Sequence, residues 1–257
     1  MTKNNKGLIL YKMKDKSDSF TVNKNTVFSL PMRLIICGRT GCGKSAKLGN
    51  LLLRDDMYRK DFKPENIYIF SGSLHGDFKL ATIIKELDIP DSNLFDDFDE
   101  QIGNVLYDQI VENYNESLDD KLKPEHSLFI FDDLSFTNRM NKSKKDSILD
   151  RLMCNGRKFL ISTILLNQKM TQLSTCSREQ CSGLMLHKSS NKQLEIVEND
   201  FNFTNSKKDF LNMVKKHTEN QHGCIIFDLQ KSEIYRNQNF EPICLCGEGK
   251  NECGGVK

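Results

Sequence analysis

Short apolar runs alternate with polar and amphipathic stretches along this chain of 257 residues. A continuous apolar run bounded by polar residues predicts a buried strand, because a strand covered on both faces needs apolar side chains in both directions. Such runs occupy residues 34–36, 66–72, 128–131, 157–168 and 182–188. Apolar residues at helical spacing instead predict helices over residues 44–53, 79–87 and 101–115. Strands and helices that alternate in this order favour an α/β fold with a mostly parallel sheet.

The two ends of the chain carry further strand patterns. Residues 223–238, GCIIFDLQKSEIYRNQ, predict two antiparallel strands joined by a tight polar turn at one edge of the sheet. Residues 8–13 and 20–30 are two apolar stretches that predict short strands along an edge of the sheet. The chain shows no internal repeat.

Residues 38–45, GRTGCGKS, fit the phosphate-loop pattern G-x-x-x-x-G-K-S/T directly after the first apolar run. Glycines let backbone N–H groups turn inward around a β-phosphate, and the start of the following helix adds a positive dipole end. Lys44 is therefore predicted to reach the β- and γ-phosphates of ATP, and the Ser45 hydroxyl to ligate Mg²⁺. The predicted nucleotide-binding residues are Gly38, Arg39, Thr40, Gly41, Cys42, Gly43, Lys44, Ser45 and Ala46.

Polar side chains end two of the later apolar runs. Asp132 and Asp133 follow the run at 128–131, and Gln168 closes the run at 157–168. Ligands of open α/β sheets gather at the carboxyl ends of the strands, and a phosphate loop needs an aspartate linked to magnesium. Asp132 is predicted to fill that role, with helix capping by the aspartate pair as the alternative.

These motifs predict a P-loop NTPase three-layer α/β sandwich with a mostly parallel central sheet and an antiparallel edge strand pair. The predicted organisation is N-terminal edge strands over 1–31, a P-loop ATPase domain over 32–240, and a flexible cysteine-containing tail over 241–257.

The amino-acid composition restricts the possible classes of protein but does not indicate a function. A formal net charge of +2 does not indicate a nucleic-acid binder, so DNA contacts would come from local clusters at 141–146, 205–209 or 213–217, each of which also fits a solvated surface. No run approaches the roughly 20 apolar residues of a membrane span, which predicts an intracellular protein. Nine scattered cysteines favour a reduced compartment. Three of them, Cys244, Cys246 and Cys253, lack the usual zinc spacing and favour a flexible reduced tail over a zinc site.

The ordered motifs resemble the FtsK/HerA superfamily of DNA-pumping ATPases, and most closely the poxvirus A32-like genome-packaging ATPases. The resemblance covers residues 32–236 and rests on CGRTGCGKS, FIFDDL, NGRKFLISTILLNQ and IIFDLQKSEIYRN. It implies that Asp132 holds Mg²⁺ through its water shell, that Asp133 orients the attacking water and that Gln168 senses the γ-phosphate. Many members of the family have Glu at the position of Asp133, and the viral branch commonly has Gly-Arg-His where this chain has Gly-Arg-Lys.

The resemblance also implies an arginine donated by a neighbouring subunit, and Arg157 is the predicted donor. If residues 157–168 form one extended strand at about 3.3 Å per residue, Arg157 lies near 33 Å from Gln168 and cannot serve its own γ-phosphate. The rival candidates are Arg139, Arg151 and Arg178, and a plain surface role for Arg157 is the alternative.

The implied function is an ATP-driven double-stranded DNA translocase that packages a viral genome into the capsid. The implied partners are double-stranded DNA, capsid or portal-vertex proteins, and further copies of the chain in a ring of five or six. The implied location is the viral factory of the host cytoplasm, with the virion as a second location. Two alternatives stay open: another P-loop ATPase, such as an AAA-type remodeller or a helicase, and a scaffold that binds ATP without turnover. The absence of a predicted helical lid after residue 190 argues against the remodeller.

Overall fold

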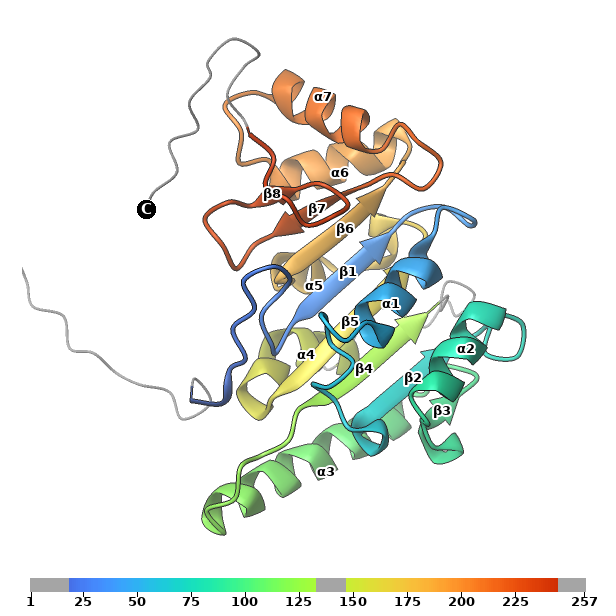
Figure 1. The fold of residues 1–257 in the computed structure, drawn as a ribbon, viewed down its shortest axis with the longest axis vertical. Helices are drawn as coiled ribbons and strands as arrows, with labels where there is room; N and C mark the ends of the chain where they lie inside the picture. The colour runs from blue at the N-terminus through green and yellow to red at the C-terminus, as the bar shows by residue number, and fades with distance from the viewer. Residues whose placement is uncertain (1–18, 133–146, 245–257) are drawn as a thin grey trace, which may run out of the picture.

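The computed structural model describes residues 19–132 and 147–244, which form a single eight-stranded sheet with helices on both faces (Figure 1). The order across the sheet is β3-β2-β4-β5-β1-β6-β7-β8. The β6–β7 and β7–β8 pairs are antiparallel and the other pairs are parallel, which confirms the predicted sheet and its antiparallel edge pair. The strands are β1 (Arg33–Cys37), β2 (Ile67–Ser71), β3 (Leu94–Phe95), β4 (Ser127–Asp132), β5 (Ile161–Asn167), β6 (Gly183–His187), β7 (Cys224–Asp228) and β8 (Tyr235–Arg236).

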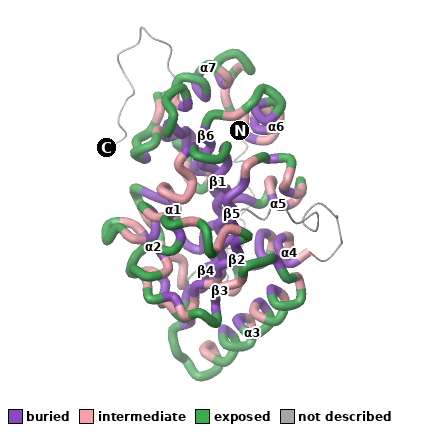
Figure 2. The backbone as a smooth tube through the Cα atoms, turned by 90° about the vertical axis from the view of Figure 1, so that its right-hand side faces the viewer, coloured by how far each residue is buried: buried purple, intermediate pink, exposed green. Residues whose placement is uncertain are grey.

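Helices cover the sheet in two layers (Figure 2). One face is covered by α1 (Lys44–Leu53) and α2 (Phe78–Glu86). The other face is covered by α3 (Glu100–Asp119), α4 (Ile148–Asn155), α5 (Thr175–Glu179), α6 (Asn191–Phe201) and α7 (Lys207–His217). The last two follow residue 190, but they bury side chains such as Val197 and Phe210 against the sheet and are a layer of the sandwich rather than a lid.

Strand β4 shows why the central strands are continuously apolar. Phe129 and Phe131 pack into the core beneath α3 and α4, whereas Leu128 and Ile130 pack into the core beneath α1 and α2. All four side chains are at most 2% exposed. Successive side chains of a strand point to opposite faces, so a strand between two helical layers requires apolar residues at every position.

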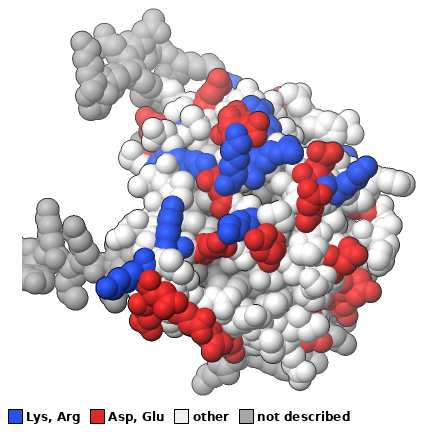
Figure 3. All heavy atoms as spheres, turned by 60° about the horizontal axis from the view of Figure 1, so that its bottom comes forward, with Lys and Arg blue, Asp and Glu red and all other residues white. Residues whose placement is uncertain are grey.

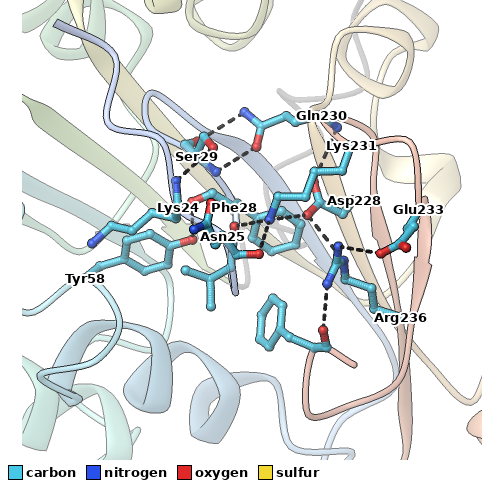
Figure 4. A network of polar contacts seen from close by, with 12 residues as sticks. Lys24, Asn25, Phe28, Ser29, Tyr58, Asp228, Gln230, Lys231, Glu233 and Arg236 are labelled. Carbon is cyan, nitrogen blue, oxygen red and sulfur yellow. Dashed lines mark hydrogen bonds and ion pairs between the residues drawn. The ribbon is translucent and has the colours of Figure 1, made fainter. Parts of the chain in front are cut away.

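The prediction of an edge strand over residues 20–30 is wrong. This segment makes a single antiparallel bridge, Val22 to Leu30, and lies outside the sheet, while the predicted strand over 8–13 falls outside the described residues. Side chains satisfy its backbone instead (Figure 4). Lys231 Nζ donates to the carbonyls of Asn25 (3.1 Å) and Val27 (2.7 Å), and Tyr58 Oη donates to that of Phe28 (2.8 Å).

A buried carboxylate anchors this arrangement at the end of β7. Asp228 is fully buried and lies 3.1 Å from Lys231 Nζ and 3.6 Å from Arg236 Nε (Figure 4). Arg236 Nη1 also donates to the Phe240 carbonyl at 2.8 Å. The antiparallel edge pair is therefore joined to the N-terminal segment by charged side chains as well as by apolar packing.

Two further sequence predictions concern membranes and thiols. Within the described ranges, no helix is long and apolar enough to cross a bilayer. Cys244 is part of a disulfide, which corrects the predicted reduced thiol at this position. Residues 245–257, with the remaining tail cysteines, lie outside the described residues.

Candidate nucleotide-binding site

The phosphate loop connects β1 to α1 and leaves the start of the helix open. Gly43 is the N-cap of α1 with φ +109°, a conformation that side-chain-bearing residues rarely adopt, and no side chain caps the helix. The first N–H groups of a helix have no intrahelical acceptor, so this end of α1 attracts an anion. Lys44 Nζ donates to the Gly38 carbonyl at 2.8 Å, which holds the ammonium group over the same loop.

The sheet register brings the other predicted residues to this loop. Asp132 pairs with Leu166 across β4 and β5, and Asn167 pairs with Cys37 across β5 and β1. The Gly38 N–H donates to the Asn167 carbonyl at 3.0 Å, which joins the loop to the strand that leads into Gln168. A cavity of about 230 Å³ results, lined by Thr40, Gly41, Gly43, Lys44, Ser45, Ser73, Asp77, Lys79, Asp132, Leu166 and Gln168.

The cavity thus unites Lys44, Ser45, Asp132 and Gln168 as predicted, while Asp133 lies outside the described residues. Sequence reasoning missed Ser73, Asp77 and Lys79, which come from the connection between β2 and α2. A signal for them existed, because β2 was predicted as a core strand and its carboxyl end opens at the same edge of a parallel sheet. Only the order of the strands reveals that β2 is the neighbour of β4, with Ser71 beside Asp132.

The donor set in the cavity fits Mg²⁺. Its lining includes the Ser45 hydroxyl and the carboxylates of Asp132 and Asp77. Hydroxyl, carboxylate and water oxygens are the ligands that this hard cation prefers, and none of the described lining residues brings a thiol or an imidazole. Cys37 and Cys42 lie on or beside the loop, but burial raises the pKa of the Cys37 thiol to about 12 and also raises that of Cys42.

A further residue that the sequence did not single out, His187, packs against the phosphate loop at Gly38. It ends β6, is fully buried, and places its Nδ1 3.1 Å from the Gly223 carbonyl, which makes Nδ1 the donor. A Cβ on Gly38 would lie 2.6 Å from the Cβ of His187, so glycine is required at the start of the loop. Burial lowers the pKa of His187 to about 4, and Lys47, Lys44 and His222 act in the same direction.

Acidification is expected to destabilise the fold through His187. Its pKa in the folded chain, about 4, lies below the ordinary value of 6.5, so the unfolded chain binds more protons between these pH values and stability falls as pH falls. The expected loss is about 2 kcal/mol between pH 7 and pH 5. Urea unfolding at both pH values measures it, with His187→Asn as the comparison because the amide keeps a donor for the Gly223 carbonyl. An equal loss in both proteins would show that His187 does not carry the effect.

Comparison with known protein families adds to this geometry. The family model described as Poxvirus A32 protein matches residues 19–250. The chain belongs to the poxvirus A32 protein family. This membership confirms the resemblance that the motifs predict. A comparison with curated protein sequences finds no match.

Solved structures with the same fold are viral and bacterial ATPases. The genome packaging NTPase B204 of Sulfolobus turreted icosahedral virus 2, in complex with AMP, superposes with a TM-score of 0.57 at 15% identity, covering 83% of this chain and 98% of B204. The DNA-packaging ATPase B204 of Sulfolobus Turreted Icosahedral Virus gives 0.53 at 17% identity, covering 84% and 99%. ATPases 2 and 3 of EssC from Geobacillus thermodenitrificans give 0.51 at 16% identity, covering 69% and 35%. These similarities confirm the predicted P-loop fold.

In this member of the A32 family, Arg157 lies in the 3₁₀ turn Gly156–Phe159 and not in a strand. The prediction that it opens β5 is wrong, because β5 begins only at Ile161. The estimate of about 33 Å to Gln168 assumed one extended strand from 157 to 168 and therefore loses its basis. Leu160, with φ +57°, turns the chain into the strand. The turn nevertheless lies at the amino end of β5, whereas the phosphate loop lies at the carboxyl end of that strand. Arg157 is therefore not among the residues that line the cavity.

Proposed function

We propose that this chain is an ATP-driven translocase that packages double-stranded viral DNA into a capsid. The observation that carries the proposal is the single cavity in which Lys44, Ser45, Asp132 and Gln168 meet. The proposal is further supported by the two B204 proteins, which have the same fold. One is described as a DNA-packaging ATPase, and the other, a genome packaging NTPase from Sulfolobus turreted icosahedral virus 2, has been solved with AMPPCP and ATP-gammaS. Capsid or portal-vertex proteins would be its partners, and the viral factory of the host cytoplasm, with the virion second, its location.

The proposed chemistry is phosphoryl transfer from ATP to water. Lys44 and the N–H groups at the start of α1 bind the β- and γ-phosphates, and Ser45 and Asp132 hold Mg²⁺, which would neutralise charge on the phosphates when bound. Gln168 lines the same cavity as Asp132 and would act as the sensor of the γ-phosphate. Asp133, the next residue after β4, orients the attacking water.

The face of the molecule seen in Figure 3 carries mixed charge, which is compatible with DNA contacts at a few separate places. The face turned forward in Figure 3 carries interspersed acidic and basic side chains and, for the residues described, no continuous basic band. Two of the predicted clusters lie at the two ends of α7, where Lys207, Lys208, Lys215 and Lys216 are exposed. The cluster at 141–146 lies outside the described residues. Contacts from such lysines to phosphates would be independent of sequence and sensitive to salt.

The test of the proposed function is ATP hydrolysis by the full chain with and without double-stranded DNA, combined with displacement of a third strand from a DNA triplex. We expect DNA to stimulate hydrolysis and ATP to drive displacement. Binding of ATP without hydrolysis would favour the scaffold alternative. A rate of ATP hydrolysis that does not change when DNA is added would favour another kind of P-loop ATPase.

Arg157 is the best supported donor to a neighbouring subunit among the described arginine candidates. Arg151 contacts Asn104 and pairs with Asp108 at 2.8 Å, and Arg178 pairs with Asp200 at 2.7 Å. The side chain of Arg157 is exposed and makes no hydrogen bond or ion pair to the side chain or backbone of another described residue. Its charge instead acts on Arg33, whose pKa is lowered first by burial and then by Arg157. A partner in a ring would offer the anion that this side chain lacks, and the fourth candidate, Arg139, lies outside the described residues.

Mixing inactive subunits is expected to restore activity if Arg157 acts on a neighbour. Arg157→Ala protein has an intact phosphate loop and Lys44→Ala protein has an intact arginine, so mixed rings contain interfaces in which both groups are present. We expect the mixture to hydrolyse ATP faster than either variant alone, and Arg157→Ala alone to lose about 10³-fold or more in rate. Lys158→Ala, an exposed neighbour in the same turn, is the matched control and should stay active. Full activity of Arg157→Ala by itself would exclude the role.

A further inference from the structure

One carboxylate joins the phosphate loop to the start of α2. Asp77 is the N-cap of α2, and its Oδ1 accepts hydrogen bonds from the N–H groups of Lys79 (2.8 Å) and Leu80 (3.3 Å). Its other oxygen, Oδ2, accepts a hydrogen bond from the Ser45 hydroxyl at 2.8 Å. Asp77 also lines the cavity that holds Lys44 and Asp132. The cap therefore faces the predicted magnesium ligand with an oxygen that the helix does not use.

The direction of this hydrogen bond decides what Ser45 can offer to a cation. A hydroxyl has one proton and two acceptor lone pairs. Because the proton points at Asp77, both lone pairs of Ser45 Oγ are turned away from that carboxylate. A hydroxyl can ligate a cation only through a lone pair, so a carboxylate that takes the proton orients the hydroxyl as a ligand.

We propose that Asp77 is a positioning residue for magnesium, acting through Ser45. It fixes the rotation of the Ser45 hydroxyl through the hydrogen bond to its Oδ2. The inference rests on the proposed ATPase function and adds to it a residue from the β2–α2 connection, outside the phosphate-loop and strand-end motifs.

The competing explanation is that Asp77 only caps α2, and the chain contains a matched control for it. Asp99 is the N-cap of α3 and accepts, through one oxygen, from the N–H groups of Gln101 (2.7 Å) and Ile102 (3.2 Å). Asp99 is not part of the lining of the nucleotide cavity. Asparagine caps helices about as well as aspartate, so Asp77→Asn and Asp99→Asn should both leave the fold intact.

Asparagine at position 77 would reverse the hydrogen bond to Ser45. Its single oxygen is needed by the N–H groups of α2, and the amide that then faces Ser45 can only donate. The hydroxyl oxygen would accept this hydrogen bond with a lone pair that the metal needs. The midpoint of magnesium dependence should therefore rise, while nucleotide binding without metal should not change.

The experiment measures binding of a fluorescent non-hydrolysable ATP analogue to the full chain at rising Mg²⁺ concentration and in EDTA, with thermal unfolding as a check of the fold. We expect Asp77→Asn to raise the Mg²⁺ midpoint at least tenfold, with binding in EDTA unchanged within twofold. Asp99→Asn should leave the midpoint unchanged. In a Ser45→Ala background, Asp77→Asn should add less than a twofold further shift, because the hydroxyl that it positions is gone.

Three results would overturn the inference. Equal midpoints for Asp77→Asn and Asp99→Asn would make Asp77 a helix cap only. An undiminished shift in the Ser45→Ala background would mean that Asp77 acts independently of the hydroxyl. Absence of analogue binding by the unmodified chain would overturn the proposed ATPase function itself, and the inference with it.

Discussion

Lys44→Ala is expected to reduce ATP turnover by on the order of 10² to 10³, the cost typical of removing one group that stabilises developing charge. In the structure, Lys44 Nζ lies over the phosphate loop, bound to the Gly38 carbonyl, and lines the cavity with Asp132 and Gln168. No other side chain of the loop itself brings a positive charge into that cavity. Alanine is the best helix former and Lys44 is the first residue of α1, so the fold should persist.

Steady-state hydrolysis and thermal unfolding, measured on the same preparation, separate loss of chemistry from loss of fold. Lys60→Ala is a control for removal of a lysine, because this side chain is 76% exposed and is not among the residues that line the nucleotide cavity. Retention of more than half of the activity by Lys44→Ala would show that the site assignment is wrong.

Gly183→Ala is expected to destabilise the fold by about 3 kcal/mol, at the upper end of the range for overpacked cores. A Cβ at this position in β6 would lie 2.8 Å from Cδ1 and 2.9 Å from Cζ of Phe28. The Phe28 ring is fully buried and packs edge-on against Phe240, with 5.5 Å between ring centroids, so it cannot rotate aside. The carbonyl of Phe28 is held by Tyr58 as well.

Urea unfolding measures this change, and Gly49→Ala is the matched control. A Cβ on Gly49, inside α1, would meet Ile83 at an ordinary 3.7 Å, so this substitution should stabilise the chain by about 0.5–1 kcal/mol through helix propensity. Adding Phe28→Leu to Gly183→Ala should recover part of the loss, because a smaller side chain relieves the overlap. If Gly183→Ala changes stability by less than about 1 kcal/mol, the N-terminal segment does not pack on β6 as described.

The sequence by itself determined the core strands and the phosphate loop. A continuous apolar run such as 128–131 is stable only as a strand that is buried on both faces. The glycines of GRTGCGKS adopt backbone conformations that residues with side chains rarely adopt. Both are local properties, so the position of β4, the start of α1 at Lys44 and the aspartate at the end of β4 could be predicted without knowing what lies beside them.

The tertiary structure decided which of these pieces are neighbours. The pattern at 20–30 predicts a strand. Lys231 and Tyr58, which are distant in sequence, instead bind backbone carbonyls of this segment, and the segment lies outside the sheet. The apolar run at 157–168 predicts a strand that includes Arg157, but the chain turns at Leu160 before β5 begins.

The same holds for the site. Asp77 and His187 carry no motif, and they reach the phosphate loop only because the strand order places β2 beside β4 and β6 beside β1. Local patterns specify which segments are buried, whereas contacts between segments distant in sequence depend on the order in which the strands pair. That order is a property of the whole chain, and no local pattern contains it.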